Sequence, residues 1–273
     1  MVRFHFSRKQ LCIPYAVFLA LFVIIPMLLI LLYAFTGEDA DGNLYFSFAN
    51  FLEFFSSTSK LQTLGVSLTI AFITTFFCLI IAYPVAYILA RSGWKRTNVL
   101  LMLFIVPMWL NFVLRITALR ELLNIIGFLG NYDYVNTVIG MVYDFLPFMI
   151  LPLYNSLQKM DNSLLEAAND LGAGPVHTFL HVTLPLSMPG ILSGITMVFM
   201  PSMTNYVVSE TLGNSNITIL GKMIEEYFST YDDMHMGSLI SIILLVIIFI
   251  TMLVSGGFKQ NADESSARGA NLW

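Results

Sequence analysis

The sequence contains few charged residues and almost no cysteine. Only 11% of its 273 residues are Asp, Glu, Lys or Arg, whereas 57% are hydrophobic. A soluble domain of this length needs far more charge to cover its surface. The two cysteines, Cys12 and Cys78, lie inside apolar runs, where a thiol normally packs as a small hydrophobic side chain. No Cys/His cluster has metal-ligand spacing. Composition therefore favours a membrane protein and predicts no metal site.

Motifs for nucleotide and nucleic-acid chemistry are also absent. No Gly-x-x-x-x-Gly-Lys-Ser/Thr occurs, so the chain has no loop of the kind that cradles ATP phosphates. Basic residues cluster only at 91–96 and the net charge is −4, which argues against nucleic-acid binding. The acidic pair Asp232 and Asp233 has no second acid-rich motif, so it makes a weak metal-diphosphate site. We predict no catalytic residues.

Hydrophobic residues fill six windows long enough to cross a bilayer, which needs roughly 20 residues of helix. The first window is uncharged and far longer than the 7–15 residue core of a cleaved signal peptide, so we favour a retained helix. The predicted fold is an all-α membrane protein with a six-span domain over 11–258, an N-terminal tail at 1–10 and a C-terminal tail at 259–273. The six windows run from 11 to 35, between Lys60 and Arg91, between Arg96 and Arg115, from 134 to 157, between His181 and Glu210, and from 237 to 258.

The distribution of basic residues predicts the orientation. With both termini in the cytoplasm, nine of the 13 Lys and Arg residues lie inside, in agreement with the positive-inside rule. The four that lie outside are Lys60, Arg115, Arg120 and Lys222. Most acids then face outward. Acidic external loops are common in such topologies, but they could also concentrate a cationic solute.

A loop over 159–185 joins the fourth and fifth windows on the cytoplasmic side. Ser163 and Glu166 have the spacing of a capping box, which predicts a helix start. Gly172 suits the left-handed position after the helix, and Pro175 prevents its continuation. The sequence thus predicts a short capped helix with an alanine-lined surface. Such a helix could lie on lipid headgroups or contact a partner.

The residues of this loop resemble the "EAA" loop of ABC importer permeases. Glu166-Ala167-Ala168, Gly172 and 182–185 (Val-Thr-Leu-Pro) occupy every position of that pattern, with Val182 in place of Ile. In that family the helix docks on an ATPase subunit and transmits its closure to the membrane helices. The resemblance therefore implies an ATPase-coupling set composed of Ser163, Glu166, Ala167, Ala168, Asp170 and Gly172.

Segments 107–115, 143–154, 183–190 and 206–213 extend the resemblance to the first (B-type) permease subunit of spermidine/putrescine importers. This resemblance implies a bacterial plasma-membrane heteromer. Its partners would be a second permease, an ATPase dimer, an external substrate-binding protein, a polyamine substrate and membrane lipid. The chain would bind no cofactor itself, because ATP and Mg would lie on the ATPase subunits.

Five residues are candidates for the substrate pathway. Asp144 is the only acid inside a predicted span, where a carboxylate needs a partner or water. It could hold a structural hydrogen bond, for instance to Asn136 or Tyr154, or it could receive an ammonium group. Glu210 follows Tyr206 and could be either a polyamine contact or a solvated loop acid. The predicted set is Asp144, Glu210, Tyr206, Trp109 and Tyr143.

Two residues near the outer end of the third window could have a structural role instead. Trp109 and Arg115 could be interface anchors. Arg115 would repel a polycation, so we expect it to pair with an acid.

The sequence therefore predicts a permease half of a polyamine ABC importer and no enzymatic activity of its own. A permease for ferric ion or an oxyanion is the nearest alternative, although the acidic outer face argues against an anion. An ion-coupled carrier that uses Asp144 as its proton site would have no use for the EAA pattern.

Overall fold

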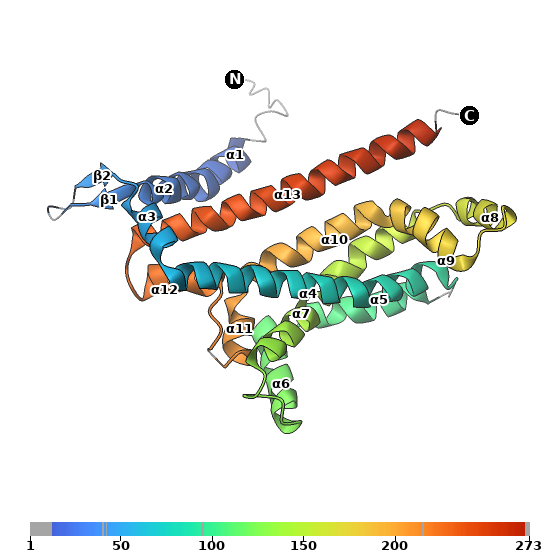
Figure 1. The fold of residues 1–273 in the computed structure, drawn as a ribbon, viewed down its shortest axis with the longest axis horizontal. Helices are drawn as coiled ribbons and strands as arrows, with labels where there is room; N and C mark the ends of the chain where they lie inside the picture. Colours follow the sequence, from blue (N-terminus) through green and yellow to red (C-terminus); the bar gives the residue numbers. More distant parts are fainter. Residues whose placement is uncertain (1–12, 40, 42, 94–95, 215, 271–273) are drawn as a thin grey trace, which may run out of the picture. The chain divides into compact units, whose positions relative to one another are not determined.

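The computed structural model describes residues 13–39, 41, 43–93, 96–214 and 216–270 (Figure 1). The chain forms two compact units. One contains the residues up to Leu61 together with Met223–Val246, and the other contains Gln62–Lys222 and the residues from Ile247 onward. The expected N-terminal tail and Cys12 lie outside the described residues.

The first unit begins with an apolar helical segment, followed by a small β-hairpin. Strands β1 and β2 pair antiparallel in the register Thr36↔Phe46, Gly37↔Tyr45 and Glu38↔Leu44, a hairpin that the sequence analysis did not predict. Two helices, α4 and α13, run from this unit into the other. The elements that begin in the first unit are α1 Ile13–Leu19, the π-helical turn η2 Ala20–Ile24, α2 Ile25–Ala34, β1 Thr36–Glu38, β2 Leu44–Phe46, α3 Ala49–Ser56, α4 Thr58–Arg91 and α13 Met234–Ala270.

The second unit contains most of α4 and the central helices. Helix α12, Leu220–Ser229, begins in this unit and continues in the first. The remaining elements are α5 Thr97–Ile105, the 3₁₀ turn η3 Val106–Trp109, α6 Phe112–Ile125, α7 Asp133–Gln158, α8 Asn162–Asp170, α9 Pro175–Thr178, the π-helical turn η4 Phe179–Thr183, α10 Leu184–Thr204 and α11 Tyr206–Leu212.

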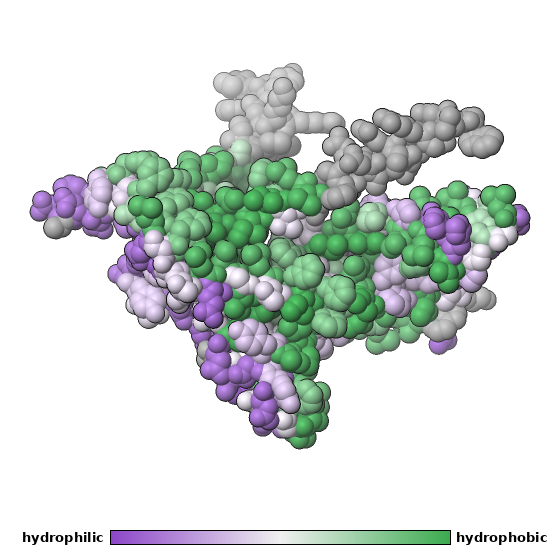
Figure 2. Space-filling view, in the orientation of Figure 1, coloured by the Kyte–Doolittle hydropathy of each residue, from purple (hydrophilic) through white to green (hydrophobic). Residues whose placement is uncertain are grey.

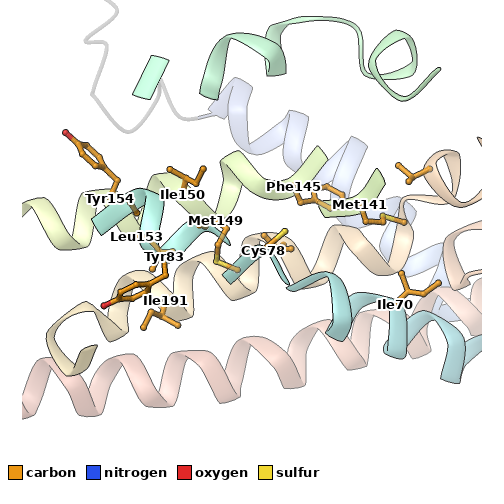
Figure 3. Packing of buried hydrophobic residues seen from close by; sticks show 14 of the residues in the cluster. Ile70, Cys78, Tyr83, Met141, Phe145, Met149, Ile150, Leu153, Tyr154 and Ile191 are labelled. Carbon is orange, nitrogen blue, oxygen red and sulfur yellow. The ribbon is translucent and has the colours of Figure 1, made fainter. Parts of the chain in front are cut away.

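The core of the second unit lies where α7 packs on α10 and α4 (Figure 3). Gly190 lets the backbones approach, because a Cβ there would lie 2.8 Å from the carbonyl oxygen of Pro152. Tyr83 of α4 reaches Ser187 of α10, with 2.8 Å between their hydroxyl oxygens. Cys78 is buried in this core, as expected of a thiol that serves as a small hydrophobic group.

Among the described residues, five helices are long and apolar enough to cross a membrane. The predicted window at 96–115 differs from these, because its helix pair, Val99–Trp109 and Phe112–Ile125, bends by 97°. Pro107 lies in the tight turn before the bend, and Asn111 caps the new helix by accepting hydrogen bonds from the amides of Val113 and Leu114. Counting the bent pair as one span gives six.

Two further boundaries differ from the predicted ones. The fifth span is a 30-residue helix from Pro175 to Thr204. This helix is interrupted at Asn205, before α11 begins. Glu210 therefore lies on a separate short helix. Helix α13 continues to Ala270, well past the predicted end of the sixth window.

Candidate functional site

Helix α8 is the short capped helix that the loop at 159–185 predicts. It has no buried residues, so Ser163, Glu166, Ala167 and Asp170 are all solvent-exposed and Ala168 is half-buried. A helix of nine residues with no buried face gains little from packing within this chain. Its surface is therefore free to contact a partner.

The start of α8 corrects one prediction. The cap is Asp161, whose Oδ1 accepts a hydrogen bond from the Ser163 amide at 3.0 Å, and the helix begins at Asn162. The capping box proposed for Ser163 and Glu166 is wrong, because Ser163 already lies inside the helix. Hydrogen bonds from the backbone and side chain of Ser163 lower the pKa of the Asp161 carboxyl, so this cap stays ionised at neutral pH.

The end of α8 confirms the predicted glycine stop. Gly172 has φ +79°, the left-handed conformation. Its amide donates to the Asn169 carbonyl at 2.9 Å, and the Ala173 amide donates to the Ala168 carbonyl at 3.0 Å. These two bonds form a Schellman motif, which satisfies carbonyls that would otherwise lack partners.

A groove lies beside this helix end. It has a volume of about 610 Å³ and is lined from Ala168 to Val182, including His177 and His181, whose rings stack 4.0 Å apart. Apolar side chains project nearby: Leu171 is 89% exposed and Val176 is 70% exposed. Exposed apolar side chains that gather beside a groove can mark a surface that another protein covers.

Arg91 ties the end of α4 to the start of this helix. Its Nη1 donates to Asn162 Oδ1, while its Nε and Nη2 are buried and have no partner within the described part of the chain. Sequence reasoning missed this link, although the cluster of basic residues at 91–96 marked the position.

A second cluster joins side chains from α6, from α7 and from the residue between α10 and α11. Arg115 of α6 contacts Asp144 of α7, with 2.6 Å between Nη2 and Oδ1, and both side chains are less than 10% exposed. Asn205, at the break between α10 and α11, donates to the other carboxylate oxygen at 3.4 Å. Both oxygens of Asp144 are thus engaged, and the prediction that Arg115 pairs with an acid is confirmed.

This cluster also identifies the hydrogen-bond partners of Asp144. Neither of the suggested ones, Asn136 and Tyr154, is its partner: Asn136 instead donates to the Phe128 carbonyl at 3.0 Å. A buried carboxylate beside a buried guanidinium is stabilised only when each compensates the other. Sequence reasoning missed Asn205, which no local motif distinguishes.

The other pathway candidates are dispersed. Tyr206 directly follows Asn205 and is half-buried against the core. Trp109 is 88% exposed at the bend after α5, and Tyr143 lines an apolar groove between α4 and α7. Glu210 is exposed and pairs with Lys222, with 3.4 Å between carboxylate oxygen and ammonium nitrogen. Within the described residues, no hydrogen bond or ion pair joins Trp109, Tyr143 or Glu210 to Asp144.

Comparison with curated proteins gives relatives across most of the chain. It is 36% identical over 253 residues to the spermidine/putrescine transport system permease protein PotB of Escherichia coli strain K12, covering 86% of this chain and 92% of that protein. The PotB homolog of Mycoplasma genitalium is 32% identical, covering 78% and 77% of the two chains.

Solved structures share the fold at low identity. A bacterial alginate ABC transporter, solved with its alginate pentasaccharide-bound periplasmic protein, gives a TM-score of 0.70 at 13% identity and covers 93% of each chain. The MetNI methionine ABC transporter in an inward facing conformation gives 0.56 at 18% identity, covering 76% of this chain and 99% of that one.

The family match spans the region that holds α8 and the Asp144 cluster. Residues 82–262 match the family described as "Binding-protein-dependent transport system inner membrane component", which covers more than half of the chain. Several helices that are long and apolar enough to span a membrane, and relatives that are permeases, agree with this match. The chain belongs to the family of binding-protein-dependent transport system inner membrane components.

Proposed function

We propose that this protein is a permease subunit of an ATP-driven importer of polyamines such as spermidine and putrescine. The observation that carries the proposal is the 36% identity to a spermidine/putrescine permease across 86% of the chain. In this proposal the chain forms half of the translocation path. A second permease forms the other half, and an external binding protein delivers the solute.

The proposed energy source is a separate ATPase dimer that binds ATP and Mg. Helix α8 supports this role, because it is capped at both ends and none of its residues is buried. The groove beside Gly172 and the exposed Leu171 extend the same surface. We assign coupling to Ser163, Glu166, Ala167, Ala168, Asp170 and Gly172. ATPase closure would then move α8 together with the spans that flank its loop.

The two acids of the proposed pathway differ in how readily they could receive an ammonium group. Asp144 is paired with Arg115 in a buried cluster, so a substrate would have to displace a desolvated guanidinium. Glu210 pairs with Lys222 at 3.4 Å and its side chain is 49% exposed. An exposed pair of this kind is weak. Glu210 is therefore the better candidate for exchange with a polyamine. The proposed pathway also includes Tyr206, Trp109 and Tyr143.

The experiment is uptake of labelled spermidine into vesicles that contain the complete complex and its binding protein, with and without ATP for the ATPases. The proposal expects ATP-dependent uptake that putrescine competes and that sulfate and ferric ion do not. Hydrolysis of ATP without polyamine uptake would be consistent with the permease assignment but would rule out polyamines as the substrate. Uptake driven by a proton gradient alone would overturn the ATP-driven mechanism in favour of an ion-coupled carrier.

A further inference from the structure

The segment at 35–57 is held at one boundary of the membrane. It begins directly after α2, which ends at Ala34, and it stops directly before α4, which begins at Thr58. Both flanking helices are apolar enough to span a bilayer. The hairpin β1–β2 and helix α3 therefore have to lie close to the lipid–water interface.

Aromatic rings fix this segment into one body. The ring of Phe35 contacts those of Phe46, Phe48 and Phe51, with centroid distances of 6.2, 5.8 and 5.1 Å. The Ser47 amide donates to the Phe35 carbonyl at 3.0 Å, which joins the base of the hairpin to the end of α2. The segment is therefore packed by its own side chains rather than loosely tethered.

An apolar stripe faces outward from this body. Leu52 and Phe55 are three residues apart and lie on one face of α3, and Phe48, the N-cap residue of this helix, precedes Leu52 by four positions. Phe48, Leu52 and Phe55 are 54%, 70% and 59% exposed. Phe46, 69% exposed, lies against Phe48 with 5.1 Å between ring centroids. We call these four residues the apolar foot.

Two polar residues of α3 pair with other groups of the protein, although the Glu53 side chain remains 65% exposed. Asn50 donates to the Thr36 carbonyl at 3.1 Å. Glu53 pairs with Lys60 at 2.6 Å, and the Lys60 ammonium lies 5.5 Å from the centre of the Tyr227 ring. A helix on an aqueous surface keeps its large apolar residues inward, whereas α3 exposes Leu52 and Phe55.

We propose that the apolar foot inserts into the boundary between headgroups and acyl chains of the leaflet next to the C-terminal end of α2. The foot continues the lipid-facing surface of that helix, where Leu31 and Leu32 are 48% and 46% exposed and no residue of the most hydrophobic window is buried. Figure 2 shows hydrophobic residues over α2 and the base of the hairpin, with hydrophilic residues at the hairpin tip. Phenylalanine and leucine beside a span, with charge kept at the tip, are the composition of an interfacial helix.

The experiment uses p-benzoylphenylalanine as a photo-crosslinker at position 52 or 55. The complete importer complex is placed in nanodiscs of phosphatidylethanolamine and phosphatidylglycerol, with and without its binding protein. Position 41 is the control, because Asp41 is exposed in the turn of the same hairpin. Both test positions already hold exposed apolar side chains, so the probe is compatible with the fold. Adducts are identified by mass spectrometry of the crosslinked peptide.

The foot predicts lipid adducts at positions 52 and 55 that exceed those at position 41 by about tenfold and do not change when the binding protein is added. Adducts with the binding protein at these positions would identify a delivery surface and overturn the proposal. Adducts with the second permease would identify a subunit interface and overturn it equally. Equal lipid yields at positions 41, 52 and 55 would show that the stripe is not inserted.

Discussion

The ion pair between Arg115 and Asp144 is the point where a single side chain decides between a structural and a transport role. We expect Asp144→Asn to destabilise the protein by about 3–5 kcal/mol, because it leaves a buried guanidinium without its carboxylate. The thermal unfolding of the purified complex measures this loss. The double variant Arg115→Met Asp144→Leu should recover most of the stability, since it removes both charges together.

The same variants separate stability from substrate handling. If Asp144→Asn unfolds like the wild-type protein but transports polyamine slowly, then Asp144 acts on the solute and its structural role is refuted. Glu210→Gln provides the matched comparison. Its ion pair with Lys222 is half-exposed, so its loss should leave the unfolding temperature almost unchanged while the uptake rate falls.

Gly172 is the second residue with a local consequence. Its φ of +79° means that Gly172→Ala should cost about 1–2 kcal/mol at the end of α8, although no atom stands in the way of the new Cβ. We expect less solute transported per ATP hydrolysed. Gly174→Ala is the control, because Gly174 also has free space around it but has φ −69°. Equal coupling in the two variants would contradict the role given to the helix end.

At the scale of helices, the close packing of α10 against α7 depends on a glycine, which has no side chain to keep the two backbones apart. In Gly190→Ala the new Cβ would lie 2.8 Å from the Pro152 carbonyl oxygen, so the two helices must separate, at a cost of about 1–3 kcal/mol. Gly65→Ala, in α4, is the matched variant, because no atom lies within 4 Å of the new Cβ. Thermal unfolding should show a lower midpoint for the first variant alone. A midpoint unchanged in both would mean that α7 and α10 can shift apart freely.

Sequence patterns predicted the helices better than their ends. Long apolar windows determine where a span lies, because lipid requires every residue of the window to be compatible. The bend after Trp109 was missed because the window at 96–115 is apolar on both sides of it. Helix α8 was predicted correctly from Gly172, but the cap was assigned to Ser163 because Asp161 and Ser163 both have side chains that can accept the bond.

The candidate site was predictable to different degrees. The residues proposed for coupling lie within one continuous loop, so a sequence motif could define them together. The partners of Asp144 come from α6 and from the break before α11, which are 29 positions before it and 61 after it. Contacts of that kind depend on how helices pack, and no local pattern encodes them. The expectation that Asp144 needs a partner or water followed from the cost of burial, whereas an acid partner for Arg115 was expected because Arg115 would repel a polycation.

At the scale of the whole molecule, the orientation in the membrane remains a prediction from the basic residues. We expect a cysteine at position 41 to react with an impermeant maleimide added outside the cell, and one at position 163 to react only after permeabilisation. Asp41 and Ser163 are both exposed on this chain, so in the absence of the ATPase subunits access is decided by the membrane. Both cysteines should be introduced into a variant that lacks Cys12. Cys78 can stay, because it is buried. The reverse labelling pattern would place both termini outside.

The uninterrupted run from Pro175 to Thr204 joins the groove beside α8 to the residue before Asn205. At the rise of a helix it is a lever of about 45 Å, and a tilt of about 5° at one end would move the other by about 4 Å. That displacement exceeds the 3.4 Å between Asn205 and Asp144. A small rotation at the end beside α8 is thus enough to make or break a hydrogen bond at the opposite end of this helix.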